Sequence, residues 1–165
     1  MSERAESFGI APLTDSLREW ARTLVHEQWG PPFVISRGRQ HVAERLPGFV
    51  AVQDDKPIGL VTYWINGDEC ELVTLNSLRE GRGVGSALVN AVRDVASGSG
   101  CHRLCLVTTN DNLHALGFHQ RRGFRICAVR AGEIDQYRIE KPTIPETGEH
   151  KIPIRDEIEL EISLR

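Results

Sequence analysis

Three glycines, Gly81, Gly83 and Gly85, stand within five residues in the stretch LREGRGVGSALVNAV, directly ahead of a helical pattern. Glycine lets the backbone approach an anion closely, and the start of a helix presents free N–H groups and the positive end of its dipole. The residue types therefore predict a phosphate-binding loop. A tight turn that happens to precede a helix is the alternative.

Two common phosphate loops do not fit this cluster. A Walker-type loop places a lysine and then a hydroxyl residue after its last glycine, whereas Gly85 is followed directly by Ser86. A dinucleotide fingerprint requires an acidic residue about 20 positions further on to hold the ribose, and none occurs between Asp94 and Asp111. A phosphate at this loop therefore requires another fold context.

Period-two patterns and short apolar runs predict the strands of a single sheet, over 49–53, 58–65, 69–75, 103–109, 124–130 and 154–164. The first three strands follow one another through the turns DDKP and NG, which is typical of an antiparallel meander. The third and fourth are separated by a helix, and this succession indicates a parallel pair within the sheet.

Helical periodicity predicts three helices, over 15–29, 84–96 and 111–121. We expect Thr14 to cap the first helix and Asp111 to cap or charge the first turn of the last. The mixed segment 33–48 predicts a loop-rich cover with a short helix over 40–46, and the proline-broken stretch 141–153 predicts an irregular connection.

The composition indicates one domain over residues 1–165. The formal net charge of −3 gives no basic footprint for nucleic acid. The N-terminal segment lacks the apolar core of a leader and no run approaches the ~18 apolar residues of a membrane helix, so we expect a cytoplasmic protein without a membrane partner. The cysteines lack metal or disulfide-framework spacing, and we expect reduced packing residues and no metal: Cys70, Cys101, Cys105 and Cys127.

Two motifs in the right order make this chain resemble the GNAT superfamily, the acyl-CoA-dependent N-acyltransferases. The family loop has the form [Q/R]-x-x-G-x-[G/A], whose last three positions match Gly83, Val84 and Gly85. Its first position falls on Glu80 instead of Gln or Arg. Arg79 and Arg82 offset this departure if they supply the positive charge, since the backbone N–H groups do most of the pyrophosphate binding.

The second family motif follows about thirty residues later, after the expected strand. It has the form N-x-x-A-x-x-[FL]-Y-x-x-x-G-F and matches at Asn112, Ala115, Phe118, Gly123 and Phe124. His119 stands where the family has its tyrosine. The insertion between the strand at 124–130 and the last strand is longer than is usual in the family.

The resemblance implies an α/β (α+β) fold with a mixed, mostly antiparallel sheet, whose central parallel strand pair is splayed for CoA and flanked by helices. It implies transfer of an acetyl group from acetyl-CoA to a primary amine by direct attack in a ternary complex, without a metal. The implied cofactor-binding residues are Val73, Leu75, Arg79, Gly81, Arg82, Gly83, Val84, Gly85, Ser86, Asn112, Ala115 and Phe118. A strand N–H near Val73 or Leu75 would face the thioester oxygen. Asn112 would contact the pantetheine arm, or would only cap its helix.

Two acidic residues of one strand are candidates for the general base. Glu69 and Glu71 lie two positions apart and so on the same strand face, where either would deprotonate the ammonium directly or through water. Glu71 is the first choice because it lies nearer the splay. The alternative is that both are solvated residues of a hairpin.

His119 raises the question of how the leaving thiolate is protonated. A tyrosine with a pKa near ~10 protonates a thiolate of pKa about 8.5, whereas a histidine near ~6.5 is mostly neutral at pH 7. His119 would act as the acid if a carboxylate raised its pKa, or would only donate a hydrogen bond to the sulfur. Otherwise the step needs no side-chain acid, or the protein is a weak or inactive CoA-binding sensor of the same fold.

The expected partners are acetyl-CoA and an amine acceptor whose identity the sequence leaves open. We expect the segments 29–41 and 132–151 to form the walls of the acceptor pocket. A plain interaction domain, which would bind no CoA, is a further alternative. Dimerisation through a sheet edge also stays open.

Overall fold

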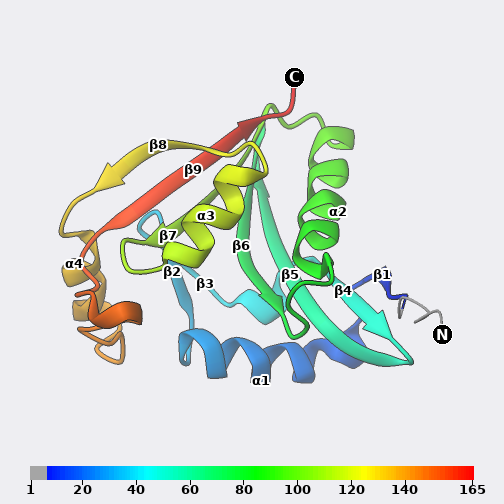
Figure 1. Cartoon of the computed structure of the whole chain (residues 1–165), viewed down its shortest axis with the longest axis horizontal. Helices are drawn as coiled ribbons and strands as arrows, with labels where there is room; N and C mark the ends of the chain where they lie inside the picture. The colour runs from blue at the N-terminus through cyan, green and yellow to red at the C-terminus, as the bar shows by residue number, and fades with distance from the viewer. Residues whose placement is uncertain (1–6) are drawn as a thin grey trace.

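The computed structural model describes residues 7–165, so the expectation of no leader lies partly outside the described residues. One mixed sheet has the order β1-β4-β5-β6-β7-β9-β8 (Figure 1). Its strands are β1 (Gly9–Pro12), β4 (Gly48–Gln53), β5 (Lys56–Asn66), β6 (Glu69–Ser77), β7 (Arg103–Thr109), β8 (Arg125–Arg130) and β9 (Glu157–Ser163). A separate hairpin consists of β2 (Val34–Ser36) and β3 (Arg39–His41).

The sheet is antiparallel except where β6 meets β7, which confirms the predicted meander and the predicted parallel pair. The two parallel strands are paired only at Glu69↔Arg103, Cys70↔Leu104 and Glu71↔Cys105. Beyond this point they separate, while β7 continues its pairing with β9 along its whole length. The sheet is therefore open in its middle, as Figure 1 shows for β6 and β7.

Helices cover both faces of the sheet. Adjacent residues of β5 point to opposite faces, and Leu60 belongs to the core beneath α1 (Arg18–Trp29), whereas Val61 belongs to the core beneath α2 (Val84–Gly98). α3 (Leu113–Arg121) packs on the α2 side, next to the opening of the sheet (Figure 1). The short helix α4 (Glu133–Glu140) lies in the insertion before β9.

Several local predictions were wrong. The segment predicted as a helix over 40–46 contains the end of β3 and a single 3₁₀ turn at Ala43–Arg45, and α4 was not predicted at all. The first helix begins as a 3₁₀ turn (Asp15–Leu17), and the Thr14 hydroxyl contacts Ser16 instead of capping it. Asp111 does not cap α3, because its carboxylate accepts hydrogen bonds from the Thr109 hydroxyl and the Glu149 N–H.

All four cysteines are free, and three of them are buried. Within residues 7–165, no group of His, Cys, Asp and Glu side chains is arranged to hold a metal ion. No helix in that range has the length and apolar character needed to cross a bilayer.

Candidate active site

A cavity of about 230 Å³ lies where β6 and β7 separate. Leu72, Val73 and Leu75 line it from β6, and Leu106 and Val107 from β7. A second recess beside α2 shares four lining residues with this cavity: Leu75, Asn112, Ala115 and His119. A third recess toward α4 shares six of them: Trp29, Val34, Ile35, Thr109, Asn112 and Ile134. A continuous channel thus runs from the start of α2, through the opening in the sheet, to the insertion.

The three glycines ahead of α2 have different structural roles. Gly81 and Gly83 have φ values of 72° and 77°, a left-handed conformation that other residues adopt only with strain, and Gly83 is the N-cap of α2. Gly85 instead permits close packing, because a Cβ there would lie 3.0 Å from the Phe118 ring. The loop therefore places the free N–H groups of the helix start at the second recess, which Glu80 and Gly85 line.

The other predicted residues of this loop are only partly available to a ligand. Val84 is buried in the core, so only its backbone remains for binding. The Ser86 hydroxyl accepts a hydrogen bond from Arg122 Nε at 2.7 Å. Arg79 and Arg82 are exposed and lie where their charges can act on an anion at the loop.

The β6 wall of the cavity contains a β-bulge. Thr74 pairs with Thr62 and Leu72 pairs with Tyr63, so Val73 has no residue opposite it on β5. A bulge leaves the extra residue unpaired and bends the strand. Val73 and Leu75, one of which the resemblance implies as the oxyanion donor, both line the cavity.

The second motif lies on α3 and its cap, and several of its residues line one wall of the channel. The Asn112 Oδ1 atom accepts a hydrogen bond of 3.1 Å from the Ala115 N–H and so caps α3, and Asn112 also lines all three recesses. The guanidinium of Arg122 stacks on Phe118, 3.4 Å from the ring centroid, and fixes this ring over Gly85. Asn112 is thus a cap whose side chain also borders the channel.

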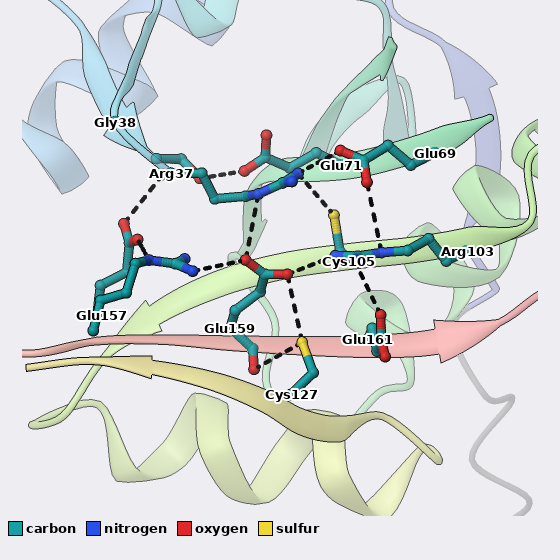
Figure 2. A network of polar contacts seen from close by, with 12 residues as sticks. Arg37, Gly38, Glu69, Glu71, Arg103, Cys105, Cys127, Glu157, Glu159 and Glu161 are labelled. Atoms are coloured by element: carbon teal, nitrogen blue, oxygen red, sulfur yellow. Dashed lines mark hydrogen bonds and ion pairs between the residues drawn. The ribbon is translucent and has the colours of Figure 1, made fainter. Parts of the chain in front are cut away.

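The two candidate bases have different surroundings. Glu69 is 23 % exposed and forms ion pairs with Arg37 Nη1 at 2.7 Å and Arg103 Nε at 3.7 Å (Figure 2). Glu71 is 2 % exposed and has one hydrogen bond, donated to its Oε1 by the Ser36 hydroxyl. Burial raises the pKa of Glu71, against a smaller lowering by Ser36 and Arg37. The solvated-hairpin alternative is therefore wrong for Glu71.

A layer of charged side chains surrounds Glu71 on the same sheet face (Figure 2). Glu159 contacts Arg37 at 3.3 Å, Arg103 at 2.6 Å and Arg130 at 3.0 Å. Burial acts to raise the pKa of Glu159, but the hydrogen bonds from Arg103 and Arg130 outweigh it and lower this pKa. The arginines thus favour the carboxylate form of Glu159, whereas burial disfavours the carboxylate form of Glu71.

His119 is buried between aromatic rings at the junction of two recesses. Its imidazole meets Phe118 and Phe124 edge-on, with ring centroids 4.9 Å and 5.4 Å away. Burial, with the positive charges of Arg122 and His114, lowers the pKa of His119 to about 4. The suggestion that a carboxylate raises this pKa was wrong, and His119 is a neutral imidazole at neutral pH.

The sequence placed the segment 29–41 at the acceptor pocket, but it did not single out the side chains of the β2–β3 hairpin that reach Glu71. Ser36 lines the central cavity, and His41 Nε2 lies 3.7 Å from Glu71 Oε2. Ile134 of α4, which lines the same cavity, lies in the insertion expected at that pocket, whereas Glu157 of β9 was missed. The only signal was the set of polar residues in the mixed segment 33–48, whose partners lie far away in the chain.

These features define a mixed α/β protein whose parallel strand pair opens beside a glycine-rich helix start. The family model described as Acetyltransferase (GNAT) family matches residues 14–124. The chain belongs to this family, which confirms the resemblance drawn from its two motifs.

The chain is 37 % identical over 150 residues to YdhI of Bacillus subtilis (strain 168), covering 90 % of this chain and 94 % of YdhI. The structure is similar to that of the IAA acetyltransferase from Bacillus cereus ATCC 14579, with a TM-score of 0.70, 20 % identity and coverage of 95 % and 99 % of the two chains. It is also similar to a GNAT family acetyltransferase from Elizabethkingia anophelis with acetyl-CoA bound, with a TM-score of 0.68, 20 % identity and coverage of 94 % and 97 %. The two structural similarities confirm the predicted fold class.

Proposed function

We propose that this protein transfers an acetyl group from acetyl-CoA to a primary amine by direct attack in a ternary complex. The observation that carries the proposal is the channel, which joins the glycine loop of α2 to the opening between β6 and β7. Membership of the acetyltransferase family and the acetyl-CoA bound to a protein of the same fold support it. The channel's two ends allow cofactor and acceptor to enter separately.

In this proposal the cofactor binds at the α2 end of the channel. The pyrophosphate binds at residues 81–86, where backbone N–H groups and the helix dipole favour an anion, with Arg79 and Arg82 adding positive charge. The pantetheine arm follows the second recess past Ala115 and Phe118. This places the thioester at the bulge, where a strand N–H at Val73 or Leu75 acts as the oxyanion donor.

Glu71 is the general base in this proposal, because its carboxylate is close to the cavity and is not neutralised by an ion pair with arginine. Glu69 is a poorer base, since two arginine partners stabilise its ionised form. A buried carboxylate with a raised pKa holds a proton more readily near neutral pH, as general-base catalysis requires.

The departing thiolate receives the second proton of the attacking nitrogen, directly or through water. The neutral imidazole of His119 takes no part as an acid and offers at most a hydrogen bond to sulfur. This reaction needs no metal, and its products are the acetylated amine and CoA.

The experiment is a thiol-release assay with acetyl-CoA and a panel of primary amines, together with calorimetry of CoA binding. We expect CoA to bind and thiol to appear only when an amine is present. The second candidate, a CoA-binding sensor without turnover, is motivated by Glu80 and His119 at the two departures from the family motifs. CoA binding without thiol release for any amine would support the sensor, and no CoA binding would exclude both.

A further inference from the structure

Glu71 is close to the cavity but does not line it. Its side chain is 2 % exposed, and Ser36, the residue that donates to its Oε1, forms part of the cavity wall. Ser36 is also buried, with 2 % of its surface exposed. A proton that leaves an amine in the cavity therefore meets the Ser36 hydroxyl before it meets the carboxylate.

The second oxygen of Glu71 is in a different position. Glu71 Oε2 and His41 Nε2 are both buried, and neither forms a hydrogen bond with any described residue. They face each other at 3.7 Å, and the His41 ring is held edge-on to Trp64 with centroids 5.3 Å apart. The carboxylate thus accepts a hydrogen bond from a hydroxyl on one side and faces an imidazole on the other without a hydrogen bond to it.

We propose that Ser36 is a catalytic residue that relays the proton of the acceptor ammonium to Glu71; this rests on the acetyl transfer proposed above. The ammonium gives a proton to Ser36 Oγ while the Ser36 hydroxyl gives its own proton to Glu71 Oε1. A neutral amine and a neutral Glu71 carboxylic acid result. The amine attacks the thioester, its second proton goes to the thiolate, and Glu71 returns its proton through Ser36 to water after product release.

The charges around Glu71 are compatible with this step. Besides His41, four titratable or charged groups face Glu71: Arg37 of the hairpin, Cys105 of β7, and Glu157 and Glu159 of β9. Burial, with the nearby charge of Arg39, lowers the pKa of His41, so the imidazole places no cation beside the carboxylate at neutral pH. The Ser36 hydrogen bond and the charge of Arg37 favour the ionised form of Glu71, against burial and the two neighbouring glutamates.

The test measures kcat against pH for the full chain with saturating acetyl-CoA and an amine that the wild type acetylates. Ser36→Ala should lower kcat at pH 7 by about 10²-fold, the low end for proton-transfer groups, with unchanged CoA affinity. Its rate should recover as the pH approaches the amine pKa of about 10, because the neutral amine needs no relay. Ser36→Thr keeps the hydroxyl and should restore most of the rate.

Two further variants separate a relay from a structural role. The double variant Ser36→Ala with Glu71→Gln should be no slower than Glu71→Gln alone, because the two substitutions interrupt the same proton path. Thr62→Val removes another buried hydroxyl, paired with Thr74 Oγ1 at 2.7 Å, and should leave the pH profile unchanged. Wild-type kcat in Ser36→Ala, or an equal loss at every pH, would overturn the relay alone. Absence of amine-dependent thiol release by the wild type would overturn the transfer and the relay together.

Discussion

The two ends of the channel are built in different ways. At the α2 end most of the lining residues come from three continuous stretches, the end of β6, the glycine loop and α3 with its cap. At the other end the polar groups come from β2, β3, β6 and β9, and are brought together only by the tertiary fold. We propose that the first end binds the polyanionic cofactor. The second end holds buried carboxylates whose pKa values are shifted in opposite directions, upward for Glu71 and downward for Glu159.

The largest expected effect distinguishes the two neighbouring carboxylates. Glu71→Gln should lower kcat at neutral pH by about 10² to 10⁴-fold, since it removes the proton acceptor, and the loss should shrink at high pH. Glu69→Gln is the matched control on the same strand face and should change kcat only a few-fold. Steady-state rates across pH for both variants measure this. A larger loss in Glu69→Gln would assign the base to Glu69.

The second effect concerns His119 and the stability of the protein at acid pH. Its folded-state pKa of about 4 lies below the unfolded value, so the unfolded state binds more protons as the pH falls through 6.5 and stability is lost. Between pH 7 and pH 4 the wild type should lose about 3 kcal/mol more free energy of unfolding than His119→Phe. Urea titrations at each pH measure this difference.

The same variant tests the role of His119 in the reaction. Because the imidazole is already neutral, His119→Phe should keep kcat within a few-fold and leave the alkaline limb of the rate profile in place. A loss of about 10²-fold with a displaced alkaline limb would instead make His119 the general acid.

The third effect tests the binding end of the channel. Gly83→Val imposes a side chain on a residue with φ of 77° and should disturb the N–H groups at the start of α2, weakening CoA binding by about 10- to 100-fold. Gly100→Val is the matched control, because Gly100 has φ of 80° and equally open surroundings beyond the other end of α2. Calorimetry should show unchanged CoA affinity in Gly100→Val. Equal affinities in the two variants would mean that the pyrophosphate binds at another site.

The smallest effect separates the two roles of Asn112. Asn112→Ala removes the cap of α3 and should lower the free energy of unfolding by about 1 kcal/mol, together with a few-fold weaker acetyl-CoA binding. Asn112→Ser retains a capping oxygen but loses the amide N–H groups, so it should restore the stability and not the affinity. Wild-type affinity in both variants would leave Asn112 as a cap only.

The sequence allowed good prediction of most of the sheet and of the glycine-led start of α2. The meander, the parallel pair and the helix after the glycines follow from local periodicity, and Gly83 follows from the conformation that a helix start requires. The hairpin was missed because its strands have only three residues each and pair with each other alone. α4 was missed because it buries only Ile134 and Tyr137, and its remaining apolar residue, Ile139, is 76 % exposed.

The choice between Glu69 and Glu71 also required the structure. Strand alternation places both residues on one face, and nothing local distinguishes them. The difference comes from Arg37 and Arg103, which are distant in the sequence and pair with Glu69. Ser36, the only hydrogen-bonding partner of the Glu71 carboxylate among the described residues, is equally distant. A partner at long sequence separation leaves no periodic signal.

The most direct test of the central claim, direct transfer to an amine, is mass spectrometry of the protein and the acceptor after incubation with acetyl-CoA. We predict that the protein remains unmodified with acetyl-CoA alone, and that with an amine the acetylated amine appears in amounts equal to the CoA released. An acetyl group on a cysteine of the protein, chased to the amine in a second step, would contradict direct attack. Release of CoA without any acetylated amine would contradict the transfer itself.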